Sequence, residues 1–155
     1  MQRMMILIGH FFAASLLTFL LASIVHSQFV IHALISIDIE VTWLDRLNMT
    51  LQDLQGLFPT LGPIISFSLL CGFLLVALLK KFKPSTNQYN YVLLPLAGGV
   101  ALWLMIIAMH PIMNITLIAS ARSSAGIASL SVCGVIGGWL FWRLRSGQAL
   151  LKVEA

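Results

Sequence analysis

The chain has 155 residues, of which 59% are hydrophobic and 9% charged, with a mean hydropathy of +0.98 and a formal net charge of +4. Soluble domains carry about 25% charged residues, so this composition excludes an ordinary water-soluble domain and indicates a membrane protein. The length suits one small helical bundle covering residues 1–155, and it excludes a second globular domain.

Four apolar stretches without acidic or basic side chains follow one another along the chain. They cover residues 5–25, 61–79, 91–109 and 124–142. Each is close to the ~20 residues that a helix needs to cross ~30 Å of hydrocarbon. The sequence therefore predicts an all-α membrane protein, a bundle of four transmembrane helices. The first stretch exceeds the about 7–15 apolar residues of a secretory signal, which favours an uncleaved anchor.

The connection after the first stretch begins with a pattern typical of a strand. Apolar and polar residues alternate from Ile35 to Trp43, and a shorter alternation covers residues 113–117. Period-two alternation predicts a half-buried strand, so the two segments would form a two-stranded ribbon. The alternative is that the first helix continues past the bilayer through this segment.

The rest of that connection has helical periodicity. Its apolar residues are Leu44, Leu47, Leu51, Leu54 and Phe58. This spacing predicts an extracytoplasmic amphipathic segment between the first two transmembrane helices, lying flat on the outer membrane surface or capping the bundle. Gly56 and Pro59 are expected to end it before the second stretch.

The basic residues predict the orientation of the helices. Seven of the nine Lys and Arg residues precede the first stretch or follow the second and fourth, and only Arg46 and Arg122 lie in the other connections. Such residues hold their end of a helix in the cytoplasm, so both termini are expected there. This distribution also explains the net charge of +4 without a nucleic-acid partner, and membrane lipid is the expected partner.

Charged groups near the outer interface form one candidate site. Arg46 and Arg122 are expected at similar depth, and Asp53 or Asp45 is expected to pair with one of them, because bidentate contacts between arginine and carboxylate suit partly buried sites. Such a pair would fasten the loop to the bundle, or it would contribute to a ligand or lipid head-group site.

Two histidines complete this candidate outer-face site. His26 and His110 end two different predicted helices at similar depth, as axial ligands of a haem would. Haem ligands usually lie deeper in a bundle, and no second pair accompanies these two. We therefore predict no catalytic residue, no metal site and no cofactor.

Small residues predict how the fourth helix packs. Ala121, Ala125, Ser129, Cys133 and Gly137 recur every four residues, and Gly134 with Gly138 forms a GxxxG pair beside them. Small residues let helix backbones approach closely in lipid, so this stripe predicts a packed bundle. The alternatives are that the same face packs against a second copy of the chain or against a partner membrane protein. The two cysteines, Cys71 and Cys133, are expected to be buried small side chains.

The run from Thr50 to Gly62, the pair Ala121-Arg122 and the ending from Gly137 to Phe141 resemble segments of small, uncharacterised four-span bacterial inner-membrane proteins. The resemblance implies a bacterial inner-membrane location and brings no activity with it. The first functional hypothesis is a non-catalytic interaction or accessory subunit that packs through its small-residue faces and presents the outer segment to a partner or lipid. The alternatives are an oligomeric transporter or channel for a small solute, and a membrane redox protein or enzyme.

Overall fold

A computed structural model describes residues 2–38, 40–82, 89–113 and 123–151 of the chain. The helices are α1 (Gln2–Ile35), α2 (Trp43–Phe82), α3 (Asn90–Met113) and α4 (Ser124–Leu151). Each is long and apolar enough to cross a membrane, and the described residues contain no strand. The all-helical prediction with four candidate membrane-spanning helices is confirmed.

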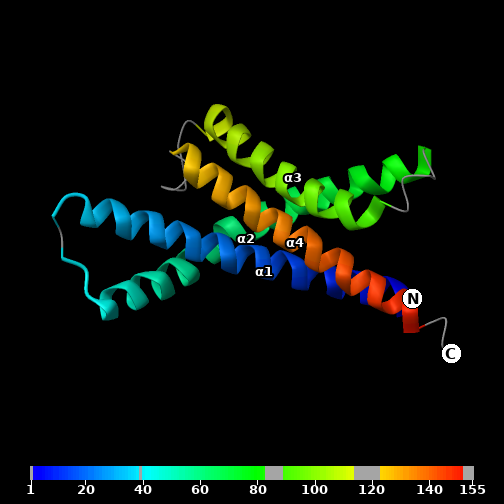
Figure 1. Ribbon diagram of the computed structural model, residues 1–155, viewed down its shortest axis with the longest axis horizontal. Helices are drawn as coiled ribbons and strands as arrows, with labels where there is room; N and C mark the ends of the chain where they lie inside the picture. Colours follow the sequence, from blue (N-terminus) through cyan, green and yellow to red (C-terminus); the bar gives the residue numbers. More distant parts are fainter. Residues whose placement is uncertain (1, 39, 83–88, 114–122, 152–155) are drawn as a thin grey trace.

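The helices form a ring in which each one packs against two neighbours. The neighbouring pairs are α1 with α2, α2 with α3, α3 with α4, and α4 with α1. The start of α1, the end of α2 and the end of α4 lie together at one end of the molecule, and the turn between α1 and α2 lies at the other (Figure 1). We call these the basic end and the hairpin end, after the residues that they carry.

Two of the helices are much longer than the bilayer is thick. At 1.5 Å per residue, the 34 residues of α1 and the 40 residues of α2 extend for about 51 Å and about 60 Å, against ~30 Å of hydrocarbon. Figure 1 shows both running past α3 and α4 at the hairpin end. We call residues 26–35 of α1 and 43–60 of α2 the outer hairpin.

The strand prediction for residues 35–43 is wrong. Helix α1 continues to Ile35, a turn follows over residues 36–38, and Asp38 has a φ of 60°, a conformation that aspartate tolerates better than most residues. The alternating residues therefore lie in the connection between α1 and α2, which is too short and too sharply turned at residues 36–38 to form a strand. The second half of the proposed ribbon, from residue 114 onward, lies outside the described residues.

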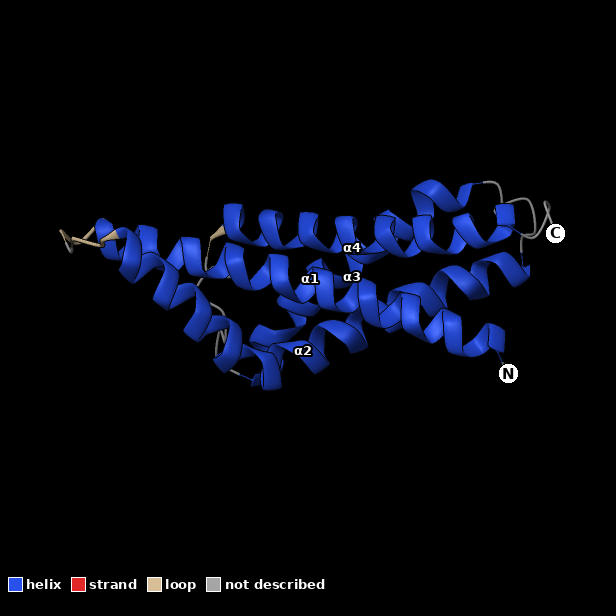
Figure 2. Cartoon of the chain, turned by 90° about the horizontal axis from the view of Figure 1, so that it is seen from below, coloured by secondary structure: helices blue, strands red, loops and turns tan. Residues whose placement is uncertain are grey.

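The amphipathic segment is not a separate helix, so the break predicted at Gly56 and Pro59 is also wrong. α2 is continuous from Trp43 to Phe82 with Pro59 and Pro63 inside it. A proline has no amide hydrogen to donate and its ring crowds the preceding turn, which kinks a helix without always ending it. The α2 ribbon changes direction near its middle, where these prolines lie (Figure 2).

A capping box explains why α2 begins where it does. The Thr42 hydroxyl accepts a hydrogen bond from the Asp45 amide at 3.3 Å, and the Thr42 amide donates to Asp45 Oδ2 at 3.1 Å. Thr42 Oγ1 also donates to the same carboxylate oxygen at 2.6 Å. Amide groups that lack partners in the first turn are thereby satisfied, and a negative charge is placed at the helix N-terminus.

Apolar side chains from all four helices fill the centre of the bundle. Phe73 of α2 stacks on Phe141 of α4, with ring centroids 4.5 Å apart, and it also forms a T-shaped pair with Phe11 of α1. Further towards the hairpin end, a cavity of about 10 Å³ lies between the helices, walled by residues such as Ala22, Leu61 and Leu102. A cavity of this size holds at most one water molecule.

Candidate functional site

The small residues of α4 pack against two different helices. A Cβ atom on Gly134 or Gly138 would meet a backbone carbonyl of α3, and a Cβ on Gly137 would meet the Thr18 side chain of α1. The GxxxG pair therefore faces α3, while Gly137 faces α1. Close backbone approach at both contacts is what small residues permit in lipid.

The stripe at positions 121, 125, 129, 133 and 137 occupies several environments. Cys133 and Gly137 are buried, Ser129 is partly buried and Ala125 is exposed, whereas Ala121 lies outside the described residues. The expectation that both cysteines are buried is correct for Cys133 and wrong for Cys71, which is exposed.

A polar contact joins the two arms of the outer hairpin. Ser27 Oγ of α1 lies 2.7 Å from Asp53 Oδ2 of α2 and 3.0 Å from the Ser23 carbonyl oxygen. Ser27 is fully buried and Asp53 is partly buried. The Ser27 hydroxyl has a single proton, and a hydrogen bond to the charged carboxylate is the stronger of the two interactions. This contact fixes the position of α2 along α1 just outside the predicted first span.

His26 lies next to this contact and is 7% exposed. Its imidazole is near enough to the Asp53 carboxylate for an electrostatic interaction, so the structure brings together two of the five residues predicted for the outer-face site. Within the part of the chain that the structure describes, His26 Nδ1 and Ser23 Oγ are buried without hydrogen-bond partners. The position of Ser23 was missed at the sequence level, although it lies one helical turn before Ser27.

Arg46 makes other contacts. Its guanidinium lies over the Trp43 ring, 5.6 Å from the centroid, and the side chain lines a hollow of about 390 Å³ with Gln28, Phe29 and His32 of α1. The interactions described for Asp53 and Asp45 go to Ser27 and Thr42 rather than to Arg46. Arg122 and the His110 side chain lie outside the described residues, so a pair between an acid and Arg122 stays a prediction.

The N-terminal part of α2 exposes a row of large apolar side chains. The exposed fractions are 87% for Trp43, 59% for Leu47 and 54% for Phe58, whereas Leu54 packs against the core. The segment runs beside α1 as the second arm of the outer hairpin (Figure 1). The segment therefore packs along α1 and does not cap the bundle, which was one of the two arrangements predicted from the sequence.

The hydrogen bonds from Thr42 also affect the charge at the tip of the hairpin. The hydroxyl and the amide of Thr42 lower the pKa of the Asp45 carboxyl below its ordinary value of 3.8, because both stabilise the ionised form. Asp45 is fully exposed, so the effect comes from these hydrogen bonds and not from burial.

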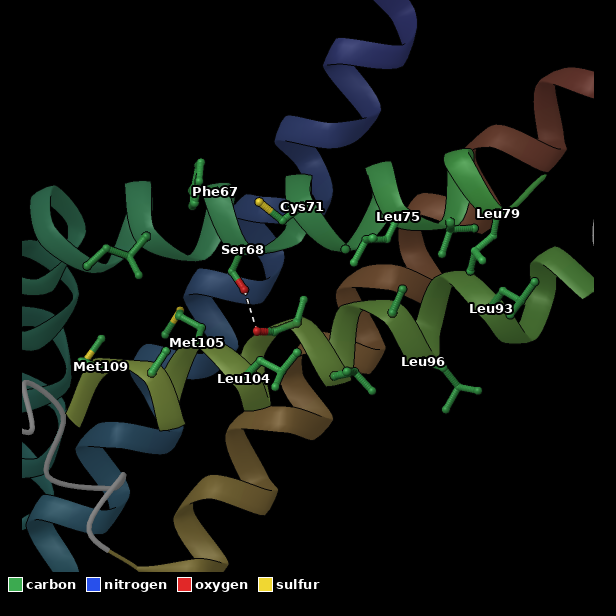
Figure 3. A pocket seen from close by; sticks show the side chains of 17 residues that line it. Phe67, Ser68, Cys71, Leu75, Leu79, Leu93, Leu96, Leu104, Met105 and Met109 are labelled. Atoms are coloured by element: carbon green, nitrogen blue, oxygen red, sulfur yellow. Dashed lines mark hydrogen bonds between the residues drawn. The ribbon is translucent and has the colours of Figure 1, made fainter. Parts of the chain in front are cut away.

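An apolar groove runs along the opposite half of the bundle, between α2 and α3 (Figure 3). Its volume is about 630 Å³, and exposed Cys71 and Leu75 of α2 contribute to its wall. At its floor, Ser68 Oγ donates a 2.7 Å hydrogen bond to the Ala101 carbonyl of α3. This bond uses the hydroxyl proton, so the groove presents almost entirely hydrocarbon to a ligand.

Within the described residues, no group of three or more His, Cys, Asp and Glu side chains is placed to hold a metal ion. The groups that are brought together are one carboxylate, one imidazole and two serine hydroxyls at the base of the outer hairpin. Of these groups, Ser27 and Asp53 join α1 to α2 by a hydrogen bond, and the four are not arranged as a nucleophile with its base. Comparisons with protein-family models, with curated proteins and with solved structures found no match for this chain.

Proposed function

We propose that this protein is a non-catalytic subunit of a bacterial inner membrane that binds a partner protein through its outer hairpin. Both termini lie in the cytoplasm and the hairpin lies on the extracytoplasmic side. Support for this orientation comes from the distribution of charge, since seven of the nine basic residues precede the first span or follow the second and fourth. All four acids within the described residues lie in the hairpin half.

The observation that carries the proposal is the row of exposed apolar side chains on the far arm of the hairpin. Helix α1 is about 51 Å long, and a bilayer with its head groups is about 40–45 Å thick. If α1 begins at the cytoplasmic interface, its other end extends past the far head groups. The tip of the hairpin, with Trp43 at 87% and Leu47 at 59% exposure, then lies beyond the lipid. Apolar surface in water is unfavourable by about 25 cal/mol per Å², so contact with a protein surface would stabilise it.

The closed centre of the bundle favours this role over solute transport. A pathway through a single bundle needs polar groups or a water-filled cavity at mid-depth. Among the described residues, a cavity of only about 10 Å³ lies between the four helices, and its walls are apolar side chains such as Ile65 and Leu130. The two long helices instead place the four acids of the described residues and the exposed apolar row of α2 at one end.

Site-specific photocrosslinking in the native membrane tests the proposal. A benzophenone amino acid replaces Leu47 in the exposed row, and the matched control replaces Gln52, which is also exposed but lies on another face of the same helix. We expect a discrete protein adduct from position 47 and little from position 52, because the partner covers the apolar row.

Adducts only with lipid, or equal labelling from both positions, would contradict the proposal. An adduct only with a second copy of the chain would also contradict it, because the row would then serve self-association. A second variant, Leu51→Gln, separates binding from folding: the adduct from position 47 should weaken while the thermal stability of the bundle in detergent stays unchanged.

A further inference from the structure

The basic end brings positive side chains together without a described acid beside them. Lys80, in the last turn of α2, lies close enough to Arg145 of α4 for the two charges to repel each other. Lys80 is partly buried, so water screens this repulsion less than it would at an open surface. The acids within the described residues, from Asp38 to Asp53, all lie in the hairpin half of the chain. An anion beside Lys80 and Arg145 would remove the repulsion.

The apolar groove between α2 and α3 ends on α2 at Leu79, one residue before Lys80. It extends along α2 from Ile64 to Leu79 and along α3 from Met109 to Leu93, which is about 22–24 Å at 1.5 Å per residue. Leu79 directly precedes Lys80 in the sequence. Figure 3 shows Leu79 and Leu93 at one end of the groove and Met109 at the other, with α4 passing behind the Leu79 end.

The shape of the groove suits a slender apolar occupant. Its volume of about 630 Å³ extends over a length of about 23 Å along the two helices, so the groove is long and narrow. A single hydrocarbon chain is narrow enough, and lipid chains surround the protein at this depth.

We propose that this groove, together with Lys80 and Arg145, is a binding site for one anionic phospholipid. An acyl chain lies along the groove past Cys71 and Leu75, and the lipid phosphate lies against the two basic side chains. The charge complementarity selects a phospholipid with a net negative charge over a zwitterionic one, because each Lys or Arg near an anionic head group contributes about 1 kcal/mol. This site is separate from the outer hairpin and does not depend on the proposed function.

Native mass spectrometry of the full chain tests the head-group part. Protein in detergent is given equal amounts of phosphatidylglycerol and phosphatidylcholine, and the lipids that stay bound are counted. We expect the parent protein to retain one phosphatidylglycerol molecule in preference to phosphatidylcholine. The ratio of bound phosphatidylglycerol to bound phosphatidylcholine should fall about fivefold in Lys80→Gln and about fivefold in Arg145→Gln, each compared with the parent. The control Lys81→Gln removes an exposed neighbouring charge, and Lys80→Arg keeps the charge; both should retain the preference.

A second pair of variants tests the groove. Cys71→Phe fills the wall of the groove, whereas Ala77→Phe adds similar bulk at an exposed position of α2 outside it. We expect Cys71→Phe alone to reduce the number of retained phosphatidylglycerol molecules, while both variants keep the thermal stability of the parent.

Two results would overturn the proposal. Equal losses in Lys80→Gln and Lys81→Gln would show only a diffuse attraction between the basic end and acidic lipid. Unchanged retention in Cys71→Phe would show that the acyl chain does not occupy the groove.

Discussion

The contact between α3 and α4 leaves no room for a side chain at Gly98. A Cβ atom at this position would overlap the Gly134 carbonyl oxygen, and it would lie 3.1 Å from the Gly134 carbonyl carbon and 3.3 Å from the Gly138 amide nitrogen. All three are backbone atoms of α4, so no rotamer change can make space. In Gly98→Ala the two helices must therefore separate locally.

The size of the effect follows from two opposing contributions. A gap of about 0.5–1 Å removes about a quarter to a half of the dispersion energy of each atom pair across it, and overpacking of this kind costs about 1–3 kcal/mol. Alanine favours the helix over glycine by about 0.5–1 kcal/mol, which offsets part of this cost. We expect Gly98→Ala to destabilise the bundle by about 1–2 kcal/mol, or about 2–8 °C in Tm.

Cys133 provides the assay for this prediction. This residue is 4% exposed, and in a Cys71→Ala background it is the remaining cysteine of the chain, so a thiol-reactive dye reports opening of the bundle on heating. The matched control is Gly9→Ala, since a Cβ at Gly9 meets nothing within 4 Å and should leave Tm unchanged or raise it. If Gly98→Ala were as stable as Gly9→Ala, the close contact between α3 and α4 would be refuted.

Two further predictions use individual hydrogen bonds. Ser68→Ala removes the bond from α2 to the α3 backbone and should cost about 0.5–1.5 kcal/mol in the same assay, whereas Ser66→Ala, for which the structure describes no interhelical hydrogen bond, should cost much less. Thr42→Val removes the side-chain cap of α2. The lowered pKa of Asp45 stabilises the folded hairpin above pH 3.8, and this stabilisation is lost as the pH falls through the folded pKa. Amide hydrogen exchange should therefore show more fraying of the α2 N-terminus in the variant than in the parent at neutral pH, and a much smaller difference at strongly acidic pH. A difference of equal size at both pH values would contradict this role for Asp45.

The four helices could be predicted from local composition. A chain in lipid must satisfy its backbone hydrogen bonds internally, so uncharged apolar stretches of about 20 residues become helices with few alternatives. The start of the fourth span was placed at Ser124, where α4 begins. The amphipathic row from Leu44 to Phe58 was likewise correct as a helical pattern, because a period near 3.6 depends only on neighbouring residues.

Several features depended on contacts between distant segments. Pro59 predicted a break in α2, but α2 packs against α1 and α3 and stays continuous through its prolines. Helix α1 likewise continues past its apolar stretch, because α2 packs against this part of α1. The same packing decides that Asp53 accepts a hydrogen bond from Ser27, a choice of partner that sequence spacing could not make.

The sequence by itself determined that four helices form and that small residues line one of them. Only the tertiary structure decided that Gly134 and Gly138 face α3 while Gly137 faces α1, and that a groove stays open between α2 and α3. The physical reason is that periodicity along one helix fixes which residues share a face, whereas the identity of the neighbour depends on how all four helices pack together.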